Sequence, residues 1–428
     1  MKKKMIIGAI VLLVISICIY PIFTKKSGGS LTSSGSLKVY LLEDDSIQRS
    51  LVDEYKINYP QVKVEEVVFK DYEDYYTKLS SDLLSGNGPD VVFGYKGVTE
   101  RLNKIIESGI FKDLRPLIEK EEEFSVDDYN DVIMNSGVYN DKQLFLPYDY
   151  SISMYITTKE LLSDNKIELD GTESYKELIE ALSTYFESGN IKDKLLFSAF
   201  PEISEFINMN ELTCIDYKNK TVDFNQEEFK KSVETYKKIY ESSLNYDLME
   251  KYQYDQVTMM NDGKIVIENC GAFPNLLYII CRDSIKNGKN PIFLGSLKTH
   301  TAMLGSFMAI NDNSKNQKEA FDFIKLGLSE EFQSKDSITY NGNLPINNKA
   351  RDINIENSKK HFNFNDQKLL EIDKKYTEEI NNIQKCIVTD QTVENLMGEE
   401  LLLYFNDEKS LDNCVKDMED KVKLYLNE

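Results

Sequence analysis

Hydrophobic positions change from strand-like to helix-like spacing several times between residues 37 and 93. Residues 37–42 form a short apolar run, and apolar residues then recur at helical spacing as far as Tyr55. A second apolar run covers residues 62–68, a helical pattern covers 71–83, and a third run begins at Asp90. This order of strand, helix, strand, helix and strand predicts a parallel sheet with right-handed crossovers. The beginning of the chain is therefore expected to be an α/β lobe.

The rest of the chain has a more helical pattern. Ser174 and Glu177 have the spacing of a capping box, which predicts a helix through Phe186. The remaining predicted elements are strands at 142–148, 154–157, 263–267 and 308–310, a helix at 320–328, and three helices within 366–428. With 428 residues the chain exceeds the usual size of one domain, so we expect two lobes.

The N-terminus has the pattern of an export or anchoring segment. Residues 1–4 are basic, 5–23 carry no charge, and 24–36 are rich in Ser, Thr and Gly. We interpret residues 1–23 as a signal peptide or membrane anchor and 24–36 as a flexible tether. The lysines that precede the apolar run favour a cytoplasmic N-terminus. Both interpretations place the body of the protein outside the cytoplasmic membrane.

A lipid anchor is an alternative to an uncleaved apolar anchor. Residues 15–18, Ile-Ser-Ile-Cys, resemble the bacterial lipobox, which makes Cys18 a possible lipidation site. The residue before the cysteine is Ile17, where a lipobox has a small residue, and apolar residues continue to Phe23. Both kinds of anchor therefore stay open.

Composition and motifs exclude several classes of function. The formal charge of −21 argues against a nucleic-acid partner, which needs a basic surface. The chain has two histidines, so a histidine-rich metal site is excluded and a Ser-His-Asp triad has few ways to form. It contains neither a G-x-S-x-G elbow nor a G-x-x-x-x-G-K-[ST] phosphate loop. We expect no catalytic residues, no metal and no cofactor.

Aromatic and acidic residues supply the candidate ligand-binding chemistry. The chain has 26 Tyr and 21 Phe but no Trp. Open α/β sheets bind ligands beyond the carboxyl ends of their strands, where rings can stack on sugars and carboxylates can accept hydroxyl protons. By this logic the candidate ligand-binding residues are Glu43, Asp44, Tyr95, Tyr148 and Asp149. A structural role fits each of these five residues equally well.

An ordered set of short segments resembles the family 1 extracellular solute-binding proteins, the maltose-binding-like class that serves ABC importers. The segments are Tyr-Pro-Gln-Val-Lys-Val at 59–64, Ser-Gly-Asn-Gly-Pro-Asp-Val at 85–91, Gly-Ile-Phe-Lys-Asp-Leu at 109–114, Met-Asn-Asp-Gly-Lys at 260–264 and Gly-Asn-Leu-Pro-Ile at 342–346. The family often has a Trp soon after its second interlobe crossing. Phe273 stands there in this chain and keeps an aromatic face, which makes it a sixth candidate.

The resemblance implies a periplasmic-binding-protein-like α/β fold with two lobes and a three-crossing hinge. The crossings are expected near Pro147, Ile267 and Leu328. Lobe one would comprise residues 37–146 and 267–328, and lobe two residues 147–266 and 329–428.

The function implied by the resemblance is ligand delivery rather than catalysis. A monomer tethered at the extracellular face of the cell membrane would close around a small molecule, most often a sugar, and present it to an ABC transporter permease. Two other functions stay open: a ligand-binding sensory subunit of a signalling system, and a secreted carbohydrate-active enzyme.

Overall fold

The computed structural model describes residues 35–95, 101–122, 124–187, 194–198, 203–243, 246–271, 274–335 and 343–428. The chain divides into residues 1–35 and a large unit, 36–428, which holds the described helices and strands. The predicted anchor, the tether up to residue 34 and the possible lipidation site at Cys18 lie outside the described residues. Within the described ranges, no helix is long and apolar enough to cross a membrane.

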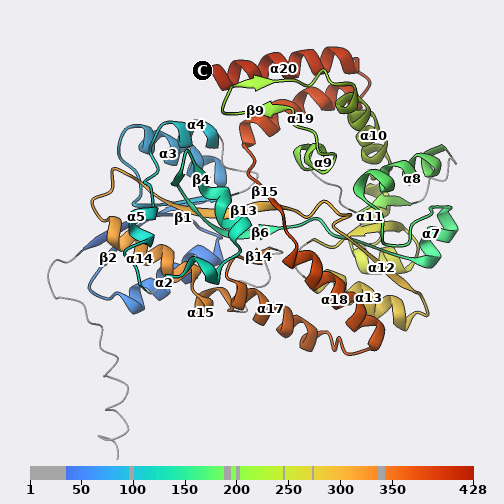
Figure 1. The fold of residues 1–428 in the computed structure, drawn as a ribbon, viewed down its shortest axis with the longest axis horizontal. Coiled ribbons are helices and arrows are strands. Elements are labelled where there is room, and N and C mark those ends of the chain that lie inside the picture. The colour runs from blue at the N-terminus through green and yellow to red at the C-terminus, as the bar shows by residue number, and fades with distance from the viewer. Residues whose placement is uncertain are drawn as a thin grey trace, which may run out of the picture. The chain divides into compact units, whose positions relative to one another are not determined.

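A seven-stranded mixed sheet, built from strands of both halves of the chain, forms one centre of the fold (Figure 1). Its path is β14-β6-β13-β3-β1-β2, with β15 paired to β13. The strands are β1 (Ser36–Leu42), β2 (Lys63–Phe69), β3 (Val91–Tyr95), β6 (Leu146–Ser151), β13 (Thr301–Ile310), β14 (Leu344–Pro345) and β15 (Lys385–Ile387). Strand β1 runs parallel to β2 and β3, which confirms the predicted parallel order. Strand β13 runs antiparallel to β3 and β6.

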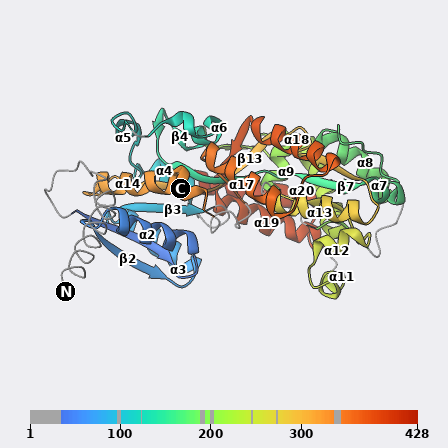
Figure 2. The same ribbon diagram turned by 90° about the horizontal axis from the view of Figure 1, so that it is seen from below.

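The alternation of side chains along β1 gives this sheet two apolar faces. Leu37, Val39 and Leu41 pack with helices α2 (Ser46–Asn58) and α14 (Gln317–Leu328). Tyr40 and Leu42 pack with helices α3 (Tyr72–Leu84) and α4 (Leu102–Glu107) on the opposite face. Figure 2 shows α2, α3 and α14 grouped around β2 and β3.

A four-stranded sheet with the order β12-β7-β11-β8 forms the second centre of the fold. Its strands are β7 (Tyr155–Thr158), β8 (Leu195–Phe197), β11 (Ile265–Asn269) and β12 (Pro291–Gly295). Helix α8 (Tyr175–Glu187) covers one face, and α12 (Gln256–Asn261) and α13 (Pro274–Lys286) pack on the other. Ser174 and Glu177 make the predicted capping box, with each side chain accepting the other residue's backbone N–H at 3.3 and 2.7 Å.

The C-terminal segment contains the three predicted helices, α18 (Gln367–Asn381), α19 (Gln391–Phe405) and α20 (Leu411–Asn427). Helices α19 and α20 pack on each other and share an apolar core with α9 (Ile203–Met209) and α10 (Glu227–Ser243) (Figure 1). The remaining elements are α5 (Arg115–Ile118), η1 (Val126–Asp128), α6 (Asp131–Met134), η2 (Asn135–Gly137), β4 (Val138–Tyr139), β5 (Lys142–Gln143), α7 (Lys159–Asn165), β9 (Ile215–Asp216), β10 (Thr221–Val222), α11 (Tyr246–Lys251), α15 (Glu330–Gln333) and α17 (Asn348–His361).

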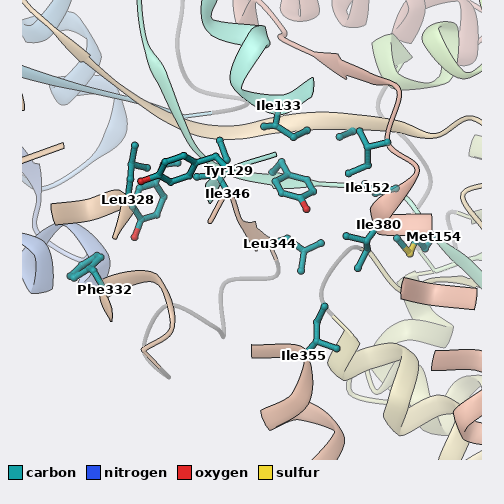
Figure 3. Close-up of a cluster of buried hydrophobic side chains, with 14 of the residues drawn as sticks. Tyr129, Ile133, Ile152, Met154, Leu328, Phe332, Leu344, Ile346, Ile355 and Ile380 are labelled. Atoms are coloured by element: carbon teal, nitrogen blue, oxygen red, sulfur yellow. The ribbon is translucent and has the colours of Figure 1, made fainter. Parts of the chain in front are cut away.

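The seven-stranded and four-stranded sheets are joined by short connections. Residues 152–154 link β6 to β7, and residues 296–300 link β12 to β13. Figure 3 shows Ile152 and Met154 of the first link together with Leu344, Ile355 and Ile380 from the C-terminal half. Strand pairing places β6 in the seven-stranded sheet and both β11 and β12 in the four-stranded sheet. The predicted lobe boundaries stay predictions.

Candidate functional site

A pocket of about 550 Å³ opens at the carboxyl ends of β1, β2 and β3. This is the edge of an open α/β sheet where ligands are expected. The pocket is lined by Leu42, Asp44, Asp45, Ser46, Ile47, Gln48, Lys70, Asp71, Tyr72, Phe93, Tyr95, Tyr148, Asp149, Gly305, Ser306 and Asn343. These residues come from the seven-stranded sheet and from the loops and helices that adjoin it.

Four of the six candidate residues meet in this pocket. Asp44, Tyr95, Tyr148 and Asp149 all line it, although they come from three separate parts of the sequence. Glu43 is exposed and is not among the lining residues, and its backbone N–H donates to the carbonyl of Phe69 at 2.8 Å. Phe273 lies outside the described residues. A ligand-binding role for all six residues stays a prediction.

Asp45 connects the end of β1 to the end of β3. As the N-cap of α2, its Oδ1 accepts the backbone N–H groups of Ile47 and Gln48 at 2.9 and 2.8 Å. Its Oδ2 accepts the hydroxyl of Tyr95 at 2.6 Å. Burial and the Asp45 charge raise the pKa of Tyr95 well above its usual range, so this phenol stays protonated. The local folding of α2 therefore also fixes the position of an aromatic ring in the pocket.

Asp149 lies at an irregularity between β6 and β13. The register shifts around Ser306, which pairs with Asp149, and such bulges re-aim side chains next to binding sites. The Nδ2 group of Asn343 donates to Oδ1 of Asp149 at 3.1 Å, and Ser306 also donates to this carboxylate. Burial is the main cause that raises the pKa of Asp149 to about 6, and the charge of Asp45 acts in the same direction. A Cβ atom on Gly305 would overlap the carboxylate, so only glycine leaves room for it.

Two tyrosines line the pocket: Tyr72 contributes an exposed ring, and Tyr148 contributes a buried side chain. Tyr72 is 46% exposed, and its ring meets that of Tyr95 edge to face with centroids 6.1 Å apart. Tyr148 is 4% exposed, and its buried hydroxyl has no hydrogen-bond partner among the residues described by the structure. Because a buried hydroxyl without a partner is costly, this group is suited to pair with a bound ligand.

Several lining residues were missed from the sequence. Asp45, Gln48, Asp71 and Tyr72 follow β1 and β2 directly, so the rule that selected Asp44 also applies to them. Ser306 and Asn343 carry no such signal, because they lie near Asp149 only through the pairing of β13 and β14 with β6.

The arrangement is suited to binding polar molecules. Carboxylates and amides can accept or donate hydrogen bonds, and the exposed ring of Tyr72 can stack on a sugar face or a cation. Within the described part of the chain, no group of three or more His, Cys, Asp or Glu side chains is placed to hold a metal ion. The fold and the site together define a ligand-binding α/β protein.

Residues 50–363 match the sequence profile of the bacterial extracellular solute-binding proteins. Since this match covers most of the chain, the protein belongs to that family, whose members bind solutes and are not enzymes. No curated protein sequence matches the chain.

Solved structures share the fold at low sequence identity. The sugar-binding protein MalE from Xanthomonas citri aligns with a TM-score of 0.66 and 12% identity, covering 92% of this chain and 97% of that one. The ABC substrate-binding protein Lmo0181 from Listeria monocytogenes, solved with cycloalternan, aligns with a TM-score of 0.63 and 16% identity over 92% and 100%. The GacH receptor of Streptomyces glaucescens, solved unliganded and with acarbose, aligns with a TM-score of 0.59 and 15% identity over 92% and 100%. The predicted periplasmic-binding-protein-like fold is confirmed.

Proposed function

We propose that this protein is a membrane-tethered, extracellular solute-binding protein that captures a carbohydrate and delivers it to an ABC importer. The observation that carries the proposal is the pocket at the carboxyl edge of β1, β2 and β3, which combines acidic, amide and aromatic side chains. Hydroxyl groups of a sugar would donate to the carboxylates, and a sugar face would stack on Tyr72. The neighbours solved with cycloalternan and with acarbose support this ligand class.

Delivery would depend on closure of the protein around the ligand. The lining residues of the pocket all adjoin the seven-stranded sheet, so one side of a bound ligand would stay open until the four-stranded sheet approaches. We place the hinge in the short links 152–154 and 296–300, because few residues there need to change their backbone angles. The ligand would favour the closed form by binding it more tightly.

The N-terminal segment supplies the other part of the proposal. Residues 1–23 would hold the protein at the outer face of the membrane, and the Ser- and Gly-rich residues 24–36 would give it reach toward a permease. The large unit formed by residues 36–428 would act as a monomer.

Thermal unfolding of the purified protein with a panel of neutral mono- and oligosaccharides tests this proposal. A sugar present at 100 times its Kd is expected to stabilise the folded state by about 2.7 kcal/mol. The sugar is also expected to be recovered intact after incubation, because a binding protein does not cleave its ligand. Amino acids and phosphate esters serve as controls, and a response to these alone, with silence for every sugar, would contradict the carbohydrate assignment.

A further inference from the structure

The pocket is far more acidic than the chain around it. Four carboxylates line it, those of Asp44, Asp45, Asp71 and Asp149, against the single ammonium group of Lys70. The whole chain has 72 acidic and 51 basic residues, a much weaker excess. The excess of acidic over basic residues in the pocket is therefore larger than the overall composition of the chain would give.

The two inner carboxylates have neutral partners. Asp45 accepts two backbone N–H groups and the hydroxyl of Tyr95, and Asp149 accepts hydrogen bonds from Asn343 and Ser306. Among the residues that the structure describes, no lysine or arginine forms an ion pair with either of them. The protein thus holds these two carboxylates in one pocket without an ion pair to either of them, an arrangement that a cation would relieve.

A second observation points to a ligand at the same place. Tyr148 lines the pocket, and its hydroxyl is buried and has no hydrogen-bond partner among the residues that the structure describes. The half-exposed ring of Tyr72 offers a face to which both ammonium groups and the C–H faces of sugar rings are attracted.

We propose that the preferred ligand of this pocket is an amine-bearing saccharide, whose ammonium group lies among the carboxylates while its ring stacks on Tyr72. The inference rests on the proposed function and narrows it from carbohydrates in general to amino sugars. An ammonium group gives each carboxylate a charge-assisted hydrogen bond, which is stronger than the bond a neutral hydroxyl gives.

Isothermal titration of the full chain with matched ligands tests the inference. Glucosamine oligomers and N-acetylglucosamine oligomers of equal length differ only in the charge and acylation of the nitrogen. The amine form is expected to bind about tenfold more tightly or better, since bonds to charged groups are the stronger ones. Its affinity is expected to fall between about 50 and about 500 mM NaCl, because salt screens charge pairs.

Variants locate the effect in the pocket. Asp149→Asn keeps the shape of the side chain and is expected to remove most of the preference for the amine form. Asp44 is exposed, so Asp44→Asn is expected to weaken the preference for the amine form without disturbing the fold. Asp53→Asn, whose side chain is 76% exposed on α2 and is not among the lining residues, removes the same charge and should leave the preference unchanged.

The outcomes separate this inference from the proposed function. Equal or tighter binding of the acetylated oligomer or of a neutral oligosaccharide, with affinity independent of salt, would overturn the inference and leave a sugar-binding protein. Tight binding of spermidine with no binding of any sugar would overturn both the amino-sugar inference and the carbohydrate assignment. Silence in every arm would contradict the pocket as the binding site.

Discussion

Tyr148 is the residue at which stability and binding are expected to oppose each other. Tyr148 lines the pocket, and its buried hydroxyl has no hydrogen-bond partner within the described part of the chain. Tyr148→Phe is therefore expected to leave the free energy of unfolding unchanged or to raise it by up to about 1 kcal/mol. The same change is expected to weaken ligand binding about three- to tenfold, because the bond to the ligand is lost. Chemical denaturation and titration calorimetry measure the two quantities.

Tyr55 provides the matched control for this experiment. It is also fully buried, but its hydroxyl donates to the carbonyl of Glu319 at 3.1 Å and is not among the groups that line the pocket. Tyr55→Phe is expected to lose about 1 kcal/mol of stability and to keep its affinity. If Tyr148→Phe instead lost stability as Tyr55→Phe does and bound ligand normally, the assignment of Tyr148 to the site would be wrong.

Among the elements, strand β11 contains a buried carboxyl group, Glu268, whose ionisation would destabilise the folded state. Glu268 is 0% exposed, it accepts a hydrogen bond from the hydroxyl of Ser198, and its second oxygen has no hydrogen-bond partner among the described ranges. Burial raises the pKa of Glu268 to about 8 from its ordinary value of 4.5. The folded state therefore holds a proton that the unfolded chain releases between these two pH values. Stability is expected to be highest below pH ~4.5 with respect to this group and to fall as the pH rises to ~8.

Urea unfolding of the wild type and of Glu268→Gln at several pH values between ~5 and ~8 measures this contribution. The wild type is expected to lose stability relative to the variant by up to a few kcal/mol, since one pKa unit corresponds to about 1.4 kcal/mol. The comparison is needed because the raised pKa of Asp149 acts in the same direction at lower pH. Parallel curves for the two proteins would show that Glu268 is ionised in the fold.

Elements defined by local signals were predictable from the sequence. Asp71 caps α3 through the backbone N–H of Asp74 as expected, and α8 begins with the predicted capping box. Strand β13 was predicted only at its end, 308–310, because Gly305 and Ser306 interrupt its apolar run, although the whole strand is buried. Strand β15 has three residues and exists through its parallel pairing with the distant Thr301–Met303 segment.

The candidate site also contains residues that local signals predicted and residues that depend on distant strand pairing. Asp44, Tyr95, Tyr148 and Asp149 were chosen because they follow or occupy predicted strands, and the sheet brings them into one pocket. Asn343 and Ser306 reach Asp149 only because β14 and β13 pair with opposite edges of β6. Such non-local pairing is not encoded in any short stretch of sequence, so these two residues could not be found beforehand.

In the molecule as a whole, the seven-stranded and four-stranded sheets are joined by the links 152–154 and 296–300 and by the C-terminal helices. The chain passes between the sheets more than once, so a rotation of one sheet against the other must bend several links together. The packed residues around Ile152, Met154 and Leu344 would provide a stable core about which such a rotation takes place (Figure 3). Closure in this form would let a ligand in one pocket change the surface offered to a permease.

A crystal structure of the protein with the saccharide that gives the largest thermal stabilisation tests the proposed binding site. Ligand density is expected in the pocket against Tyr72, Tyr148 and Asp149, with residues of the four-stranded sheet closing over the ligand. Density at another place, such as the separate pocket lined by Tyr236, Tyr240 and Phe405, would contradict the proposed site.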